Sequence, residues 1–196
     1  MKKGRHLKGS VDKYLKGLSS RTITPGGGSA SALTAALGVS LNLMVINYTK
    51  KSDRINKAKA RQRKSLNELS ALIDDDCKAF DVLMRALSSG RSAQKEYRTA
   101  AFVPLKICRQ CYVSLGITEF LSKQGNKNLM TDVGCAADIL RAAFNSARLN
   151  VKINLKEVKD KDFAQRSEKD LSDMRKNIKA RYTKIYEKVN KATGKR

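Results

Sequence analysis

Apolar residues recur at helical spacing over most of this 196-residue chain, and only two prolines interrupt the pattern. Ala, Leu and Lys, which favour helices, are abundant. The chain has few runs in which apolar and polar residues alternate, the pattern of a half-buried strand. These features predict an all-α fold, a multihelical bundle that forms a single domain over residues 1–196. The pattern is clearest near the C-terminus, at Leu171, Met174, Ile178, Tyr182, Ile185 and Val189.

The chain is expected to divide into six helices. Segments 88–90 and 124–126 contain Ser, Gly and Asn and supply breaks, and Pro104 is expected to kink or restart the fourth helix. No apolar run approaches the roughly 20 residues that span a bilayer, so no membrane partner is expected. The expected helices are 11–18, the segment from the glycines to about 50, 55–88, 93–123, 131–149 and a basic helix at about 163–191, with a short turn near 155–158.

A turn rich in glycine precedes the second helix, where the sequence reads Thr24-Pro25-Gly26-Gly27-Gly28-Ser29. Three consecutive glycines let another group approach the backbone closely, and the free N–H groups of a helix N-terminus favour an anionic or electron-rich ligand. A glycine turn before a tightly packed core helix explains the segment equally well. The apolar positions that follow are Leu33, Leu37, Leu41, Met44, Val45 and Tyr48.

One acidic residue falls within the apolar stripe of the third helix. Asp76 comes three residues after Ile73 and four before Phe80, so its side chain is expected to face inward. Desolvation can raise the pKa of such a carboxyl toward neutrality, as a general acid or base requires. A buried ion pair with Lys or Arg is the alternative. The only histidine, His6, lies in the N-terminal segment, which disfavours histidine-based catalysis or metal binding.

Asp132, Asn126 and Asn128 form a second group of polar candidates. Asp132 stands at the expected start of the fifth helix, where an acid complements the helix dipole. This capping role explains Asp132 at least as well as a catalytic role does. Asn126 and Asn128 are equally typical of a turn.

The four cysteines are expected to be buried structural thiols in a reducing compartment, and a cytoplasmic location is the default. A zinc site made from all four thiolates is geometrically conceivable, but separate helices would have to converge on it, so no metal is expected. They are Cys77, Cys108, Cys111 and Cys135.

The formal net charge of +23 is spread over three segments. Residues 1–24 carry seven cations and one acid, and residues 50–64 carry eight cations and one acid. Residues 156–196 carry fourteen cations and seven acids. A charge of this size attracts polyanions, nucleic acid included. Because aromatic residues are not interleaved with the cations and no DNA-binding motif is present, a solvated basic surface is favoured over nucleic-acid binding.

Five segments in order carry a resemblance to a known family. They are 24–29 with Ala30, Leu33 and Met44-Val45; 76–84; 103–105; 125–137; and 150–155. Together they resemble the C-terminal domain of the formiminotransferase-cyclodeaminase family, which also includes stand-alone methenyltetrahydrofolate cyclohydrolases. The resemblance covers residues 10–165. The sequence departs from the family pattern at residues 86–91, which lack the turn with a basic residue and a proline that usually follows the third helix.

The resemblance implies a multihelical fold, an intertwined homodimer and a tetrahydrofolate derivative as substrate, with no permanently bound cofactor. The chemistry it implies is the conversion of a one-carbon unit between N5 and N10. A cyclohydrolase, which opens 5,10-methenyltetrahydrofolate to the 10-formyl form, is preferred because 196 residues leave no room for a formiminotransferase domain. The alternatives are a formimidoyltetrahydrofolate cyclodeaminase, which releases ammonia, and a non-enzymatic basic helical module that binds nucleic acid or another anion.

The resemblance also suggests roles for the candidate residues. Asp76 and Asp132 are expected to share the proton transfers, and Asn126 and Asn128 to offer amide hydrogen bonds. The basic surface would attract a polyglutamylated folate. The remaining substrate-binding candidates are Thr24, Pro25, Gly26, Gly27, Gly28, Ser29 and Phe80.

Overall fold

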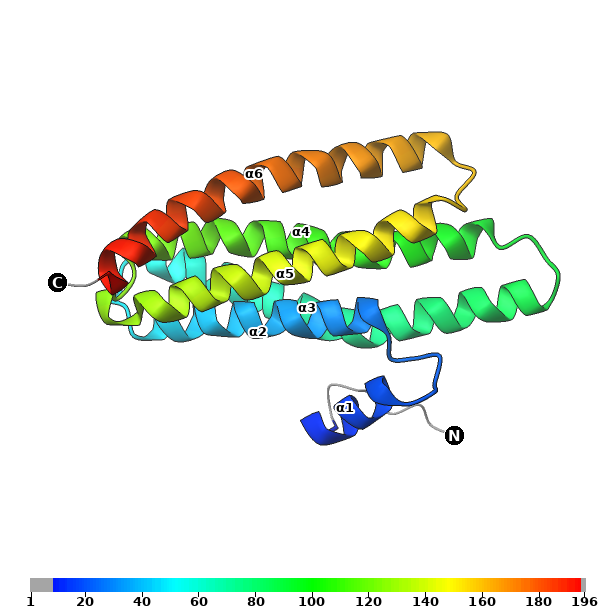
Figure 1. The fold of residues 1–196 in the computed structure, drawn as a ribbon, viewed down its shortest axis with the longest axis horizontal. Helices are drawn as coiled ribbons and strands as arrows, with labels where there is room; N and C mark the ends of the chain where they lie inside the picture. Colours follow the sequence, from blue (N-terminus) through cyan, green and yellow to red (C-terminus); the bar gives the residue numbers. More distant parts are fainter. Residues whose placement is uncertain (1–8, 195–196) are drawn as a thin grey trace.

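The computed structural model describes residues 9–194, in which five long helices run side by side and a short one lies outside them (Figure 1). Consecutive long helices run in opposite directions. The described residues contain no strand, so the prediction of an all-α bundle is confirmed. His6 lies outside the described residues. The helices are α1 (Val11–Ser19), α2 (Gly27–Asn47), α3 (Asp53–Ser88), α4 (Gln94–Gln124), the 3₁₀ turn η2 (Lys127–Leu129), α5 (Met130–Leu155) and α6 (Lys161–Thr193).

Side chains cap the α-helices α1, α3 and α6, whereas α2, α4 and α5 have no such cap. Ser52 accepts a hydrogen bond from the backbone N–H of Ile55 at the start of α3, and Asp160 accepts one from Phe163 at the start of α6. The residue before α2 is Gly26, which has no side chain to offer. The first N–H groups of α2 therefore need partners from elsewhere in the fold.

One boundary prediction is wrong, and another is wrong in part. The fifth helix does not end near residue 149 but continues to Leu155. The fourth helix is continuous through Pro104, so it does not restart there, and the kink stays a prediction. A proline has no N–H, so the carbonyl four residues earlier, that of Ala100, loses its helical donor. Asn154 of α5 replaces it, because its Nδ2 donates to the Ala100 oxygen at 3.1 Å.

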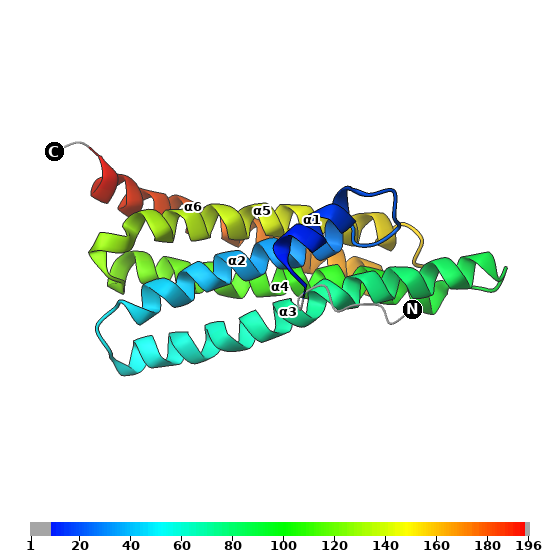
Figure 2. The ribbon, with the colours of Figure 1, turned by 90° about the horizontal axis from the view of Figure 1, so that it is seen from below.

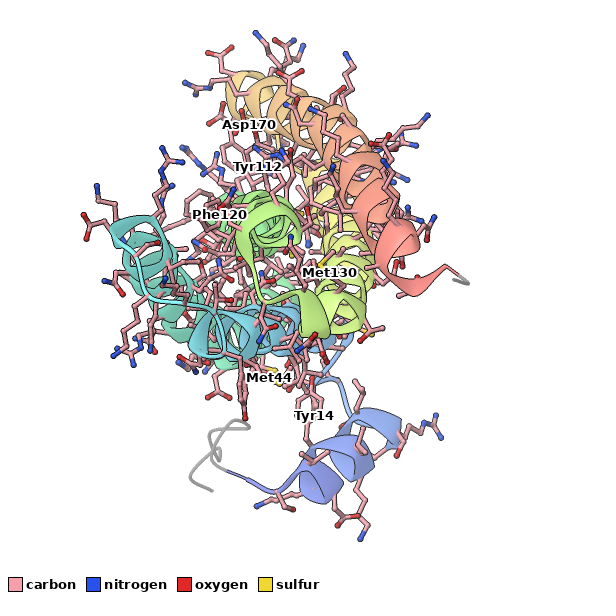
Figure 3. All side chains as sticks on the ribbon, turned by 90° about the vertical axis from the view of Figure 1, so that its left-hand side faces the viewer. Tyr14, Met44, Tyr112, Phe120, Met130 and Asp170 are labelled. Atoms are coloured by element: carbon pink, nitrogen blue, oxygen red, sulfur yellow. The ribbon has the colours of Figure 1, made fainter. Side chains whose placement is uncertain are left out.

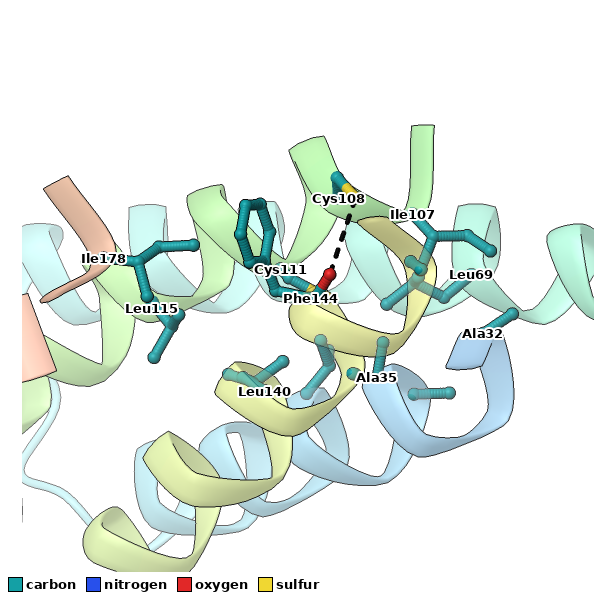
Figure 4. Close-up of a cluster of buried hydrophobic side chains, with 14 of the residues drawn as sticks. Ala32, Ala35, Leu69, Ile107, Cys108, Cys111, Leu115, Leu140, Phe144 and Ile178 are labelled. Carbon is teal, nitrogen blue, oxygen red and sulfur yellow. Dashed lines mark hydrogen bonds between the residues drawn. The ribbon is translucent and has the colours of Figure 1, made fainter. Parts of the chain in front are cut away.

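The hydrophobic core lies where α2, α4 and α5 meet α3 and α6 (Figure 4). Phe144 is fully buried at its centre, and the Cys108 thiol next to it donates to the Phe144 carbonyl at 3.8 Å. Cys77 and Cys111 are buried as well, and all four thiols are free. Cys135 is exposed, so the prediction that it is buried is wrong. Within residues 9–194, no group of three or more His, Cys, Asp or Glu side chains is placed to hold a metal ion.

A buried polar cluster fixes α2, α3 and α4 against one another. The Asn42 Nδ2 donates to the Gln62 Oε1 at 3.2 Å, and Thr118 donates to the Asn42 Oδ1 at 3.1 Å. Gln62 in turn donates to the Ser114 hydroxyl at 3.3 Å. Asn42, Gln62, Ser114 and Thr118 have no exposed surface. Since sliding any of the three helices would strand these groups without partners, the cluster sets their relative register.

Helix α2 is apolar on all sides, and only part of it faces the core. Its 21 residues and mean hydropathy of 1.7 make it long and apolar enough to cross a membrane, so the prediction that no segment approaches this length is wrong. Within the bundle 56% of that stretch is buried, which accounts for its composition without a bilayer. Gly38 allows the close approach of α5, since a Cβ there would lie 2.7 Å from Leu140.

The other side of α2 carries a row of apolar residues that the protomer covers only in part. Leu37 and Tyr48 are 54% and 69% exposed. Met44, in the same row, points away from the bundle (Figure 3). We call this row the outer stripe of α2; it consists of Leu33, Leu37, Leu41, Met44 and Tyr48.

Helix α1 lies across the outside of the bundle (Figure 2). Its only buried residue is Tyr14, while Val11 and Leu15 are 72% and 54% exposed. At the other end of the chain, α6 is the expected basic helix and packs on α4 and α5.

Candidate functional site

A cavity of about 350 Å³ opens at the N-terminus of α2. Its walls come from α3, α4 and α5 and from the turn that precedes α2. The walls are mostly apolar and carry a few polar groups, as is typical of small-molecule sites. The residues that bear on its chemistry are Thr24, Gly26, Gly27, Gly28, Asp76, Phe80, Tyr97, Asn150, Asn154 and Glu157.

The Asp76 carboxylate lies directly against the start of α2. A Cβ at position 28 would lie 2.6 Å from the Asp76 Oδ2 and closer still to Oδ1, so only glycine fits there. The backbone N–H of Ser29 donates to the carboxylate. Asp76, on α3, thus serves as the cap that Gly26 cannot provide, and its negative charge faces the positive end of the helix dipole.

Asp76 has an unusual acidity for a carboxyl group. Burial raises its pKa to about 6, and the hydrogen bond from Ser29 lowers the pKa by a smaller amount. At neutral pH the carboxyl is therefore mostly ionised, yet it can take up a proton at little cost. This is the property expected of a general base that later acts as an acid.

A second layer of contacts holds this part of the site in place. The Ser29 hydroxyl is buried and lies 3.1 Å from the Tyr14 hydroxyl, which fastens α1 to the start of α2. Ser29 also hydrogen bonds with the Cys77 thiol, whose pKa burial raises to about 11. Cys77 is therefore a neutral packing residue and not a nucleophile.

Two asparagines on α5 face the same cavity, and sequence reasoning did not single them out. The Asn150 amide lies 3.4 Å from the position that a Cβ on Gly27 would occupy. Its Nδ2 donates to the Ser146 carbonyl at 3.0 Å. Asn154 donates to Ala100 and, at 2.8 Å, to the Asn150 carbonyl. Their spacing of four residues within 150–155 puts both on one helical face, and that spacing is the signal that could have identified them.

The structure brings six of the predicted site residues together. They are the cavity residues Thr24, Gly26, Gly27, Gly28, Asp76 and Phe80. Pro25 and Ser29 lie next to the cavity but do not line it: Pro25 packs against Gly17 of α1, and Ser29 is fully buried. The roles of these residues in binding or catalysis stay predictions.

Asp132, Asn126 and Asn128 lie at the other end of α2 from the cavity. Asn126 donates to the carbonyl of Tyr48 at 2.9 Å, at the C-terminal end of α2, and its Oδ1 accepts from the backbone of Asn128. Asp132 stands in the first turn of α5 near by. The 21 residues of α2, at 1.5 Å each, separate this group from Asp76 by about 30 Å. Within one protomer these residues do not join the cavity.

The cavity thus combines an acid of shifted pKa, amide groups and a helix N-terminus. The N–H groups of Gly27 and Gly28 have no carbonyl of their own helix to bond. Free N–H groups of this kind can stabilise negative charge on an oxygen, as in an oxyanion hole. The arrangement suits the addition of water, or of an amine, to a carbon that passes through a tetrahedral intermediate.

Comparisons with known proteins agree on one family. The sequence model of the formiminotransferase-cyclodeaminase family matches residues 10–173. The methenyltetrahydrofolate cyclohydrolase of Methylorubrum extorquens is 32% identical, over 92% of this chain and 95% of that protein. The formimidoyltransferase-cyclodeaminase of Gallus gallus is 29% identical over 82% of this chain, which spans only 34% of that protein.

A solved structure has the same fold. The crystal structure of formiminotetrahydrofolate cyclodeaminase from Thermotoga maritima superposes with a TM-score of 0.89 and is 28% identical in sequence. The match covers 94% of this chain and 97% of that one.

Proposed function

We propose that this chain, which belongs to the formiminotransferase-cyclodeaminase family, hydrolyses 5,10-methenyltetrahydrofolate to 10-formyltetrahydrofolate. The observation that carries the proposal is the Asp76 carboxyl, held against the start of α2 in a cavity and having a pKa of about 6. The similarity to a cyclohydrolase along nearly the full length of both chains supports this reaction over others.

Asp76 is the general base of the proposed reaction. The methenyl carbon bridges N5 and N10 and carries positive charge, which the ionised carboxylate attracts. Asp76 takes a proton from a water molecule as its oxygen adds to this carbon, and the carbon becomes tetrahedral. The bond from carbon to N5 then breaks, Asp76 returns its proton to N5, and the hydroxyl proton leaves to solvent. One water is consumed and one proton is released.

The groups around Asp76 position the substrate. The Phe80 ring, 37% exposed in the cavity wall, offers a flat apolar surface to the pterin or the p-aminobenzoyl group. The Asn150 amide offers hydrogen bonds to polar edges of the substrate. The N–H groups of Gly27 and Gly28 stabilise the oxygen of the tetrahedral intermediate as negative charge develops on it.

A formimidoyltetrahydrofolate cyclodeaminase is the second candidate, because the structure from Thermotoga maritima carries that name and shares the fold. In that reaction N10 closes the ring on the formimino carbon and ammonia leaves. The departing nitrogen needs a proton, so Asp76 would act first as an acid.

Two assays on the full chain separate these candidates. The first follows the near-ultraviolet absorbance of methenyltetrahydrofolate, which disappears on ring opening. The second supplies 5-formimino-tetrahydrofolate and follows ammonia. Loss of absorbance faster than the spontaneous rate, without ammonia release in the second assay, supports the cyclohydrolase. Absence of both reactions at all pH values from 5 to 9 would overturn the proposal.

The proposed enzyme is a homodimer that pairs through the outer stripe of α2. Leu37 and Tyr48 leave apolar surface exposed along this row, and a second copy would cover it. A two-fold axis near Leu37 makes the paired α2 helices antiparallel. The C-terminal end of one α2, with Asp132 beside it, then lies at the N-terminal end of the other, where Asp76 stands. In this arrangement the two acids share one site across the interface.

Two further points belong to this proposal. The basic surface attracts folates that carry polyglutamate tails, which would appear as a steeper salt dependence of KM for the polyglutamylated substrate than for the monoglutamate. The buried free thiols of Cys77, Cys108 and Cys111 suit a reducing, cytoplasmic environment.

A further inference from the structure

A second cavity, of about 520 Å³, lies between α3, α4 and α6 and shares no residue with the Asp76 cavity. Its floor is apolar and includes Ala58, Gly116 and Ile117. Four cations and two aromatic rings surround this floor, and they are Arg54, Lys57, Arg61, Arg181, Tyr112 and Phe120. The volume is in the range of small-molecule sites.

Three of the cations stand on one face of α3 without counter-ions. Arg54, Lys57 and Arg61 follow one another at steps of three and four, so their charges are neighbours and repel one another. In the part of the chain that the structure describes, none of the three forms a salt bridge, and no acidic residue lines the cavity. A bound polyanion would remove this repulsion.

The fourth cation, Arg181 of α6, is held in a fixed orientation. Its Nη1 donates to the Tyr112 carbonyl at 2.7 Å, and its guanidinium carbon lies 4.2 Å from the centre of the Tyr112 ring. The group rests on Gly116, where a Cβ would come within 3.2 Å of Nη1. Glu119 is its only acidic neighbour among the described residues, at 4.0 Å. A guanidinium fixed in this way loses little entropy when it binds a phosphate or carboxylate.

Phe120 gives the cavity an aromatic wall. It lies on the side of α4 that faces α3 (Figure 3), and it also lines a neighbouring hollow with Arg54 and Tyr48. An aromatic ring beside guanidinium groups can stack a planar base while the cations bind phosphates.

We propose that this cavity binds a small polyanion with an aromatic ring, of the nucleoside triphosphate class. The phosphates lie among Arg54, Lys57, Arg61 and Arg181, and the base lies against Phe120. Three or four negative charges match the four cations, and a cavity of about 520 Å³ has the size for one nucleotide. The site goes beyond the proposed folate reaction and does not depend on it.

The test is isothermal titration of the full chain with ATP, inorganic tripolyphosphate and adenosine at physiological salt. We expect one ATP per chain, bound more tightly than either fragment. The double variant Arg54→Ala/Arg61→Ala should weaken ATP binding about tenfold or more, since charge-assisted contacts are lost. The matched control Arg63→Ala/Lys64→Ala removes the same charge from the same helix outside the cavity, and it should leave the affinity nearly unchanged. Phe120→Leu should weaken ATP but not tripolyphosphate.

Three results would overturn the proposal. Equal weakening by the two double variants would mean diffuse attraction by surface charge. Tripolyphosphate binding as tightly as ATP would mean that Phe120 holds no base. Tighter binding of triglutamate or of a single-stranded oligonucleotide than of ATP would assign the cavity to a folate tail or to nucleic acid. None of these measurements uses the folate reaction at Asp76, so failure of this proposal leaves the proposed reaction untouched.

Discussion

The carboxylate of Asp76 fills the space that a side chain on Gly28 would need. The acid of α3 and the bare backbone of α2 are therefore two halves of one arrangement, in which the glycine admits the carboxylate and the carboxylate caps the helix.

Replacement of Gly28 by Ala should disrupt this contact. The new methyl group would overlap the carboxylate oxygens, so we expect a loss of about 1–3 kcal/mol in the free energy of unfolding and a large loss of activity. Ala normally stabilises a helix relative to Gly, so the expected sign is the reverse of the usual one. Urea denaturation measures it. Gly26→Ala is the matched control, because nothing lies within 4 Å of a Cβ there; equal destabilisation by both changes would contradict the argument.

The pH dependence of the reaction should follow the ionisation of Asp76. A general base must be deprotonated, so kcat/KM for the cyclohydrolase should rise about tenfold per unit below pH 6 and level off above it. A cyclodeaminase that needs the protonated acid would lose activity above the same pH. Initial rates, corrected for the spontaneous reaction, distinguish the two profiles. A rate that is flat from pH 5 to 7 would remove Asp76 from the proton transfers.

The variant Asp76→Asn should be inactive and yet more stable than the natural protein at pH 8. The folded state raises the pKa of Asp76, so the stability associated with the protonated acid is fully present below about pH 4 and is lost as the pH rises through about 6. A shift from 3.8 to about 6 corresponds to about 3 kcal/mol at most. Thermal unfolding at pH 4 and pH 8 tests this: the gain should appear at pH 8 and vanish at pH 4.

Mixed dimers test whether a site is shared between protomers. Asp76→Asn and Asp132→Asn should each be inactive alone. If one site takes Asp76 from one chain and Asp132 from the other, a mixed dimer has one intact site, and an equimolar mixture refolded together recovers about a quarter of the natural activity. No recovery, with both variants folded and exchanging subunits, would exclude sharing.

The outer stripe of α2 should determine the oligomeric state. Leu37→Glu puts a charge in the centre of the stripe, where Leu37 is 54% exposed, and should convert a dimer to monomers in sedimentation velocity. Val82→Glu, on α3 and 41% exposed, adds the same charge elsewhere and should leave the dimer intact. Monomers in the natural protein at micromolar concentration would contradict the proposed pairing.

Sequence patterns predicted the helices and the position of Asp76 because both depend on local periodicity. Asp76 interrupts an apolar stripe, and this alone indicates which way its side chain points. The course of α4 was not predictable in this way. The carbonyl that Pro104 leaves without a helical donor is that of Ala100, and its partner, Asn154, comes from another helix.

Two other features needed the fold itself. The order of motifs along the chain does not give their distances along the bundle. The sequence motifs therefore did not predict that Asp132 lies far from Asp76. The row from Leu33 to Tyr48 has helical spacing, but α2 is apolar on every side, so periodicity did not reveal which side the protomer leaves uncovered.

The hydrogen bond between Asn42 and Gln62 also affects the position of Asp76 relative to Gly28. In these antiparallel helices Gly28 lies fourteen residues before Asn42, and Asp76 lies fourteen residues after Gln62. The two intervals are equal, so the register that the Asn42–Gln62 pair sets between α2 and α3 also places Asp76 opposite Gly28. Deleting a single residue from either interval would rotate one partner by about 100° and shift it by about 1.5 Å, parting them although neither was altered.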